Sequence, residues 1–225
     1  MDVDLRKYLQ QNYSKLTWKN RIKITFDIID VLYKIHKDNT IHRDLHSRNI
    51  LYRQHYDYWY ISDLAFCGPA NKPSESIYGN LPYIAPEVIA KKEYTKASDI
   101  YSIAMIMWEI SSGQPPYNNY EHDFDVSMKI IDGIRPEIVP GTPLKYQQLM
   151  EQCWNADPLN RPDGNTLIEE LRSLLFYQNE DNIKVQTDIF IDVNTDHFKN
   201  TTSKVYIFKD VPKPKNAFDI EHEGI

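Results

Sequence analysis

The stretch IHRDLHSRNI, residues 41–50, sets a dense run of polar side chains between two apolar ends. A core strand does not tolerate that density of charge, because buried charges need partners. Asp44 and Asn49 stand five positions apart, behind His42 and Arg43. One interpretation is a polar turn after a helix, with Asp44 acting as a cap. The other, which we favour, is a loop that carries chemistry.

Composition limits the classes of protein to consider. The 225 residues suffice for one sizeable domain, or for one domain and a tail. The 41% hydrophobic content is globular, and the formal net charge of -6 argues against broad binding to nucleic acid or anionic membranes. Cys67 and Cys153 are far apart in sequence, and we expect them to be reduced thiols rather than a disulfide.

Neither a secretory signal nor a membrane span is expected. Residues 1–15 contain no apolar h-region. The longest apolar stretch, Ile100 to Ile110, includes Ser102 and Glu109 and is shorter than the ~20 residues that cross a bilayer. We therefore expect a cytoplasmic or nuclear protein.

Apolar residues recur at helical spacing over most of the chain. The pattern predicts helices at about 20–37, 97–112, 123–132, 143–153 and 166–175. The second of these is apolar nearly all round, which is typical of a helix at the centre of a domain. Thr166 and Glu169 form a candidate capping box at the start of the last helix.

Two segments before residue 90 are predicted to be non-helical. Residues 50–62 are rich in Ile, Tyr and Trp around a polar turn at 54–57, which predicts a short β-hairpin. Residues 63–87 contain repeated Gly and Pro and predict a long irregular loop. A loop of this length inside a domain is usually functional or disordered.

Beyond Phe176 the composition shifts to Asp, Asn, Lys and Thr. Two weakly alternating runs, Val185 to Val193 and Val205 to Val211, could pair as a small hairpin. The acidic, polar composition favours a mostly disordered tail instead.

The opening stretch fits the H-R-D-x-x-x-x-N pattern of phosphoryl-transfer enzymes. Such enzymes need a carboxylate that accepts the proton of the attacking hydroxyl, and oxygen ligands for magnesium on the triphosphate. Asp44 would be the carboxylate and Asn49 one of the ligands. Asp63 follows fourteen residues after Asn49, and Ala85-Pro86-Glu87 stands at the end of the irregular loop.

In this order the motifs resemble those of eukaryotic protein kinases. Asp63 occupies the D-F-G position, and residues 85–87 are an intact A-P-E motif. The helix that contains Asp99 resembles the central helix of the family, and Arg161 lies in a segment similar to its late helical subdomain. The resemblance implies that Asp99 hydrogen-bonds the catalytic-loop backbone and that Arg161 pairs with Glu87.

The resemblance covers residues 1 to about 175 and implies a mainly α fold. It predicts a protein-kinase-like C-terminal lobe with a short β-hairpin near the catalytic loop, in which the small N-terminal lobe is absent. Residues 1–176 would form this truncated kinase domain and residues 177–225 the tail. No G-x-G-x-x-G loop and no V-A-I-K lysine occur in the 225 residues.

The implied cofactors are ATP and Mg2+. Asp44 would be the catalytic base, Asn49 and Asp63 the magnesium ligands, and Leu51 the apolar floor beneath the adenine. Asp4 is a candidate for a ribose contact, although an acid at the start of a helix is an equally good interpretation.

Arg43 is implied as the receiver of a phosphate on the loop between Asp63 and Glu87, which is the activation segment. Ser74, Ser76 and Tyr78 are candidate donors of that phosphate. His42 is expected to be a packing residue behind the catalytic aspartate.

Subclass signals are mixed. Asn80 replaces the threonine of the serine/threonine-kinase G-T-x-x-Y-x-A-P-E pattern. His46 stands where those enzymes carry lysine, whereas Arg48 is similar to the A-A-R-N loop of tyrosine kinases. The mixture resembles the tyrosine-kinase-like branch, which favours serine or threonine as the acceptor and leaves tyrosine open.

We therefore expect a protein kinase that transfers the ATP γ-phosphate to hydroxyls of a protein substrate. The alternatives are a non-catalytic kinase-like interaction module, or a kinase fragment that is inactive alone. In either case a partner could bind the open face left by the missing small lobe. The A-P-E motif and the late helices argue against a kinase of small molecules.

Overall fold

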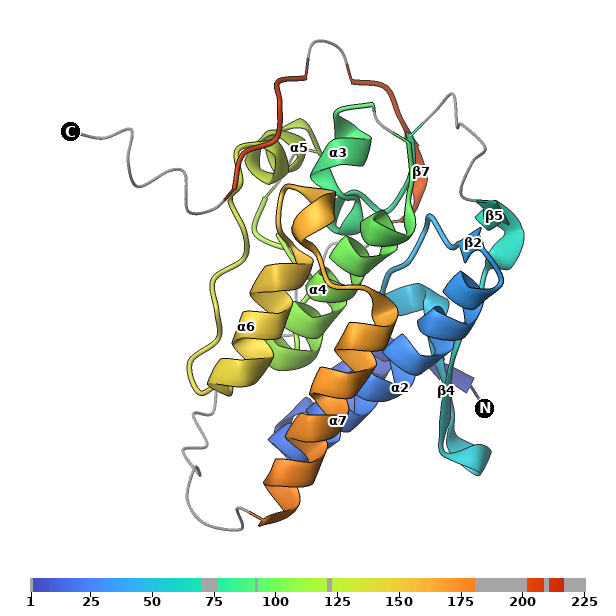
Figure 1. Ribbon diagram of the computed structural model, residues 1–225, viewed down its shortest axis with the longest axis vertical. Helices are drawn as coiled ribbons and strands as arrows, with labels where there is room; N and C mark the ends of the chain where they lie inside the picture. Colours follow the sequence, from blue (N-terminus) through green and yellow to red (C-terminus); the bar gives the residue numbers. More distant parts are fainter. Residues whose placement is uncertain are drawn as a thin grey trace, which may run out of the picture.

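The computed structural model describes residues 2–69, 77–91, 93–120, 123–180, 202–208 and 211–216. The fold is mainly helical, as predicted (Figure 1). The helices in these ranges are α1 (Leu5–Asn12), α2 (Trp18–Lys37), α3 (Pro86–Ile89), α4 (Lys96–Ser112), α5 (Asp123–Ile131), α6 (Leu144–Cys153) and α7 (Gly164–Glu180). The strands are β1 (Asp2–Asp4), β2 (Thr40–Ile41), β3 (Ile50–Arg53), β4 (Tyr58–Ile61), β5 (Gly68–Pro69), β6 (Ile77–Gly79) and β7 (Lys204–Tyr206).

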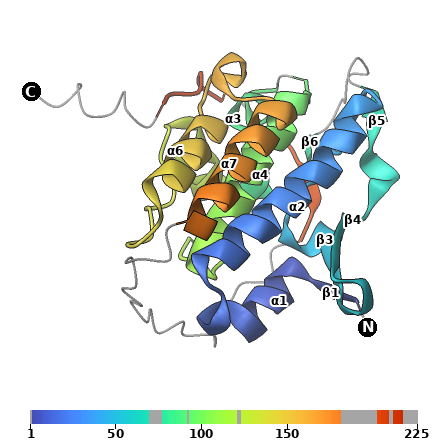
Figure 2. The same ribbon diagram turned by 60° about the horizontal axis from the view of Figure 1, so that its bottom comes forward.

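Helix α4 lies at the centre of the domain, as its apolar sequence predicts. Its side chains are buried along nearly the whole helix, and α2 and α6 pack against it (Figures 1 and 2). A capping box begins it: Thr95 and Ser98 each accept the backbone N–H of the other through their side-chain oxygens. Gly113 ends it at a φ of +73°, where an added Cβ would lie 2.6 Å from the ring of Tyr13.

The predicted hairpin is confirmed. β3 and β4 pair antiparallel, from Ile50 opposite Ile61 to Arg53 opposite Tyr58. Asp57 closes the turn at a φ of +48°. Sequence periodicity did not predict β1, which lies at the start of the chain and pairs with the other edge of β3.

Helices α2 and α7 lie side by side in both views (Figures 1 and 2). The proposed capping box at Thr166 is wrong, because α7 already begins at Gly164. The Asp163 carboxylate accepts the backbone N–H of Thr166 (2.8 Å), so an aspartate three residues earlier satisfies the free end of the helix. The helix also continues beyond the predicted end at residue 175, to Glu180.

Part of the tail is docked on the domain, which differs from the expected disorder or separate hairpin. Lys204–Tyr206 (β7) pairs antiparallel with β6 of the activation segment, while the run from Val185 to Val193 lies outside the described residues. Further on, the Lys215 N–H donates to the Ile131 carbonyl (2.7 Å), and the Asn216 side chain accepts the Ala156 N–H (2.8 Å). The reason is that β6 offers an unpaired edge, which the second half of the tail fills.

Both cysteines, Cys67 and Cys153, are free thiols, as expected. None of the helices in the described ranges is long and apolar enough to cross a membrane.

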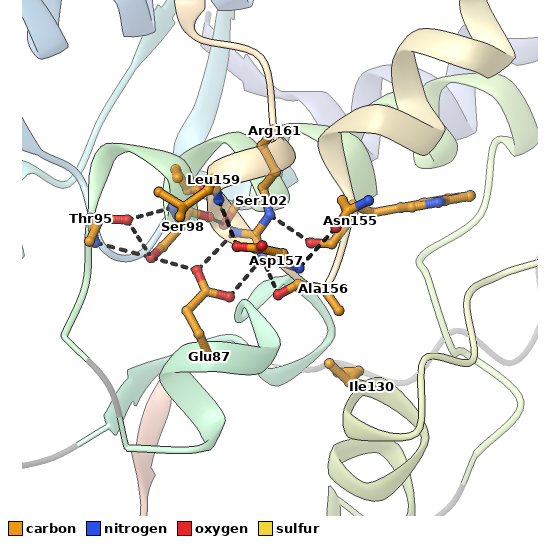
Figure 3. Close-up of polar contacts among 12 residues, drawn as sticks. Glu87, Thr95, Ser98, Ser102, Ile130, Asn155, Ala156, Asp157, Leu159 and Arg161 are labelled. Carbon is orange, nitrogen blue, oxygen red and sulfur yellow. Dashed lines mark hydrogen bonds and ion pairs between the residues drawn. The ribbon is translucent and has the colours of Figure 1, made fainter. Parts of the chain in front are cut away.

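An ion pair between Glu87 and Arg161 joins the end of the activation segment to the loop before α7. It is bidentate, with nitrogen–oxygen distances of 2.8 and 2.7 Å, and both side chains are almost fully buried. Figure 3 shows further partners: Ser98 donates to Glu87, and Arg161 donates to the carbonyls of Asn155 and Ala156. Arg161 also donates to the Ala97 carbonyl. The predicted pairing of Arg161 with Glu87 is confirmed.

Because the pair is buried, removing one partner strands the other charge and costs about 3–5 kcal/mol. We expect Arg161→Ala to lower the melting temperature by about 2–4 °C for each kcal/mol lost. Arg172→Ala, which removes an exposed arginine of α7, is the matched control and should change it little. Differential scanning calorimetry measures both, and equal shifts would contradict a stabilising role for the pair.

Candidate active site

Asp99, near the start of α4, holds the backbone of the 41–50 loop. Its carboxylate accepts the backbone N–H groups of His42 (2.8 Å) and Arg43 (3.0 Å). The same carboxylate accepts the imidazole Nε2 of His36 at the end of α2 (2.8 Å). Asp99 is 1% exposed and cannot be solvated by bulk water. These hydrogen bonds replace those that the carboxylate loses when it is buried. The contact that the resemblance implied for Asp99 is present.

His42 is buried behind the catalytic position, as expected of a packing residue. Its Nε2 lies 2.9 Å from the Ser62 carbonyl, and its Nδ1 accepts the Asp44 N–H (3.3 Å). A carbonyl only accepts, so Nε2 carries a proton, and Nδ1, which accepts the Asp44 N–H, carries none. His42 therefore orients the backbone of Asp44.

Asp44 is buried at the base of the site, with 3% of its surface exposed. The Asn49 amide nitrogen donates to its carbonyl (2.8 Å) and approaches its Oδ2 (3.4 Å). Its Oδ1 accepts the hydroxyl of Ser203 (2.7 Å) and lies 3.5 Å from Nε2 of His46. The two carboxylate oxygens thus have different partners, and Oδ1 is the one that faces a hydroxyl group.

The two proposed magnesium ligands are placed near each other by the hairpin. Ser62, which precedes Asp63, donates its N–H to the Asn49 carbonyl (2.8 Å). Because both Asn49 bonds to Asp44 use its amide nitrogen, the amide oxygen remains for a cation. Asp63 is exposed and has a φ of +58°, a conformation that aspartate tolerates better than most residues.

These donors suit magnesium, which prefers oxygen ligands and usually takes few from the protein when a triphosphate supplies others. Within the described ranges, no group of three or more His, Cys, Asp or Glu side chains is placed to hold a metal ion. A site formed by Asn49, Asp63 and phosphate oxygens needs no such group.

Arg43 adopts a φ of +70°, which the two hydrogen bonds from the loop to Asp99 hold in place. Its guanidinium lies against Gly68, where an added Cβ would be 3.1 Å from Nη1. Of the three candidate phosphate donors, Ser74 and Ser76 lie outside the described residues. Tyr78 is described, and its ring stacks on Phe66 with centroids 3.9 Å apart.

Leu51 and Asp4 sit opposite each other in the pairing of β3 with β1. Leu51 is partly buried, on the central strand of the β1-β3-β4 sheet. The Asp4 carboxylate accepts the N–H of Lys7 (2.9 Å) and so caps α1. The sequence left two interpretations of Asp4 open, a ribose contact and an acid at the start of a helix, and the structure shows the second.

One buried network was not predicted. Arg6 of α1 donates to Glu109 of α4 (3.1 Å) and to the Tyr83 hydroxyl (2.9 Å), and that hydroxyl donates to Glu109 (2.5 Å). Burial raises the pKa of Tyr83 well above its usual value, so the hydroxyl keeps its proton. The signal was Glu109 itself, since an acid in a helix that is apolar all round needs a buried partner.

A second unpredicted contact is that of Ser203 with Asp44. The two residues are far apart in sequence, and the tail composition suggested no role for Ser203. No local pattern could have revealed this contact, because it depends on the pairing of β7 with β6.

Comparison with known sequences points to one family. The family model described as "Protein tyrosine and serine/threonine kinase" matches residues 2–171. The chain is 30% identical to the serine/threonine-protein kinase STY17 of Arabidopsis thaliana, over 75% of the chain and 30% of that protein. It is 30% identical to the dual specificity protein kinase zakA of Dictyostelium discoideum, over 76% of the chain and 24% of that protein.

A mammalian relative is similar to the same degree. The chain is 31% identical to the dual serine/threonine and tyrosine protein kinase of Mus musculus, over 71% of the chain and 18% of that protein. The chain therefore spans less than a third of the length of these relatives. With the family model covering most of its length, and Asp44, Asn49 and Asp99 arranged as described, this chain belongs to the protein tyrosine and serine/threonine kinase family.

Proposed function

We infer that residues 1–176 form the large lobe of a kinase that transfers the γ-phosphate of ATP to hydroxyl groups of proteins. The observation that carries this proposal is the bond from an aliphatic hydroxyl, that of Ser203, to Oδ1 of the buried Asp44 (2.7 Å). A catalytic base must lie within hydrogen-bond reach of the proton that it removes. Asp44 meets this condition toward a serine hydroxyl.

The chemistry of each proposed residue follows from its surroundings. Asp44 Oδ1 orients the acceptor hydroxyl and takes its proton. Asn49 and Asp63 would hold magnesium, which neutralises charge on the triphosphate when bound. Leu51, partly buried on β3, would contact the adenine. Arg43, held beside Gly68, would receive a phosphate from the activation segment and so fix that segment.

We propose serine and threonine as the main acceptors. The named relatives include serine/threonine kinases and dual-specificity kinases. The hydroxyl that contacts Asp44 in this structure belongs to a serine, which supports a site that admits a short aliphatic acceptor side chain. Tyrosine remains the second acceptor class, because Arg48 follows the tyrosine-kinase pattern.

Apolar side chains are exposed beside the proposed nucleotide site. Leu64 is 55% exposed and Phe66 is 39% exposed, one and three residues after Asp63. Exposed apolar side chains that gather next to a site are typical of a surface that a partner covers. We propose that this surface receives a small kinase lobe, from the same protein or from another chain.

The assigned roles can be tested by isosteric substitution in the protein expressed from its complete coding sequence. Asp44→Asn removes the base and should lower kcat by about 10²–10⁴-fold. Asp63→Asn removes a charged magnesium ligand and should raise the magnesium concentration needed for half-maximal activity. The readout is phosphate transfer to casein.

Asp125→Asn, at an exposed position of α5, is the matched control and should retain full activity. Melting temperatures of all three variants should stay close to that of the wild type, because the side-chain shapes are unchanged. Undiminished turnover in Asp44→Asn would exclude it as the base.

Residues 1–225 assayed alone should bind magnesium-ATP weakly and turn over slowly. The sequence of these residues contains neither the glycine-rich loop nor the V-A-I-K lysine with which protein kinases hold the triphosphate. Isothermal titration with ATP, with and without magnesium, measures the binding. Tight binding together with steady turnover by this piece would contradict the need for a small lobe.

A further inference from the structure

We propose that Ser203 is a phosphorylation site that this kinase modifies within its own chain. Residues 202–208 lie where a protein substrate would bind, and they present the Ser203 hydroxyl to Asp44. This inference rests on the proposed function, since it assigns the acceptor for the same catalytic site.

The Ser203 hydroxyl is oriented by two partners. Nδ1 of His46 accepts the N–H of Arg48 (3.2 Å), so the neutral imidazole carries its proton on Nε2. That Nε2 lies 3.0 Å from Ser203 Oγ and donates to it. Ser203 in turn donates its own proton to Asp44 Oδ1 (2.7 Å). The hydroxyl therefore points its proton at the base and keeps a lone pair for attack.

The pairing of β7 with β6 sets this position. Gly79 stands opposite Lys204, so Ser203 is the next residue beyond the paired strand. Gly79 has a φ of +148°, a conformation that favours glycine, and an added Cβ would lie 3.3 Å from the Ile84 side chain. The glycine therefore allows this backbone conformation at the point where the activation segment pairs with β7. Addition of a strand to an exposed edge is a common mode of peptide recognition.

Alternate side chains of the segment are anchored in the domain. Tyr206 and Phe208 are each 8% exposed, and their rings lie 5.7 Å apart. Val205 and Ile207, between and beside them, are 56% and 84% exposed. Such alternation is that of a strand with one face buried. Lys204 adds an ion pair with Asp123 of α5. In Figure 2 the orange-red segment that contains β7 lies next to β6.

The proposed reaction uses ATP as its only co-reactant. Ser203 Oγ forms a bond to the γ-phosphorus, and the bond from that phosphorus to the β,γ-bridging oxygen breaks. ADP leaves with the electron pair of that bond. The hydroxyl proton passes to Asp44 Oδ1, the atom that it already contacts.

Phosphorylation would also release the tail. A phosphoserine carries about two negative charges at neutral pH, and it would lie against the Asp44 carboxylate. Like charges at hydrogen-bond distance repel, so the modified segment should leave the site. The unmodified tail therefore blocks protein substrates, and its phosphorylation opens the site to them.

The test uses the protein expressed from its complete coding sequence, incubated with magnesium-ATP and casein. Phosphorylated residues are mapped by mass spectrometry over a dilution series. We expect phosphate on Ser203 at a rate per molecule that does not change with protein concentration, as an intramolecular reaction requires. Ser203→Ala should lose this phosphate, and Ser173→Ala, at an exposed position of α7, should keep it.

A second pair of variants tests the anchoring. Tyr206→Ala removes a buried anchor and should slow Ser203 phosphorylation by roughly tenfold or more, since small misplacements of an acceptor are costly. Casein phosphorylation should be maintained or increased, because the site becomes free. Val205→Ala, on the exposed face of the same strand, is the matched control and should change neither rate.

The outcomes separate the two proposals. Phosphorylated casein with unmodified Ser203 overturns this inference and leaves the proposed function in place. A rate of Ser203 phosphorylation per molecule that rises in proportion to protein concentration also overturns it, because the acceptor would then come from another molecule. If neither casein nor Ser203 is phosphorylated, the proposed function fails and the inference fails with it.

Discussion

The site depends on the carboxylate of Asp99. It is buried at the first turns of α4 and accepts hydrogen bonds from the backbone of His42 and Arg43 and from the imidazole of His36. An unpaired carboxylate at that depth would cost several kcal/mol, so the loop has one conformation that satisfies it. That conformation includes the positive φ of Arg43 and places Oδ1 of Asp44 within hydrogen-bond distance of the Ser203 hydroxyl.

Other buried carboxylates near the site also have hydrogen-bonding partners. Glu109, on α4, is satisfied by Arg6 and Tyr83, and Glu87, on α3, by Arg161. Each pair joins segments that are distant in sequence, with α4 or its first turn as the common support. A buried pair adds little net stability over an apolar contact, but a mispaired arrangement would strand a charge. We therefore interpret these pairs as devices that select one arrangement of the loops around the site.

The activation segment connects this framework to the tail. Its strand β6 offers a free edge, and free edges invite pairing with other chains. Here β7 covers that edge, and the pairing places Ser203 at Asp44. The contact that protects the edge is thus the one that occupies the proposed substrate site. Protection and occupancy are linked because both depend on the same short ladder of backbone hydrogen bonds.

The sequence by itself indicated the family, the five longest helices and the hairpin, but periodicity did not predict the short helices α1 and α3. Helical periodicity and motif spacing are local, so Asp44, Asn49 and Asp63 could be proposed as site residues without coordinates. The family resemblance added the pairing of Glu87 with Arg161. Tertiary structure alone decided the network around Glu109, the cap of α7 and the docking of the tail. A helix cap depends on which nearby side chain reaches the free N–H groups. At α7 it is Asp163 that does so, and Thr166 supplies the N–H that Asp163 accepts. The position of Ser203 depends on a strand partner more than a hundred residues earlier in the chain, and a weakly alternating run does not specify which edge it joins.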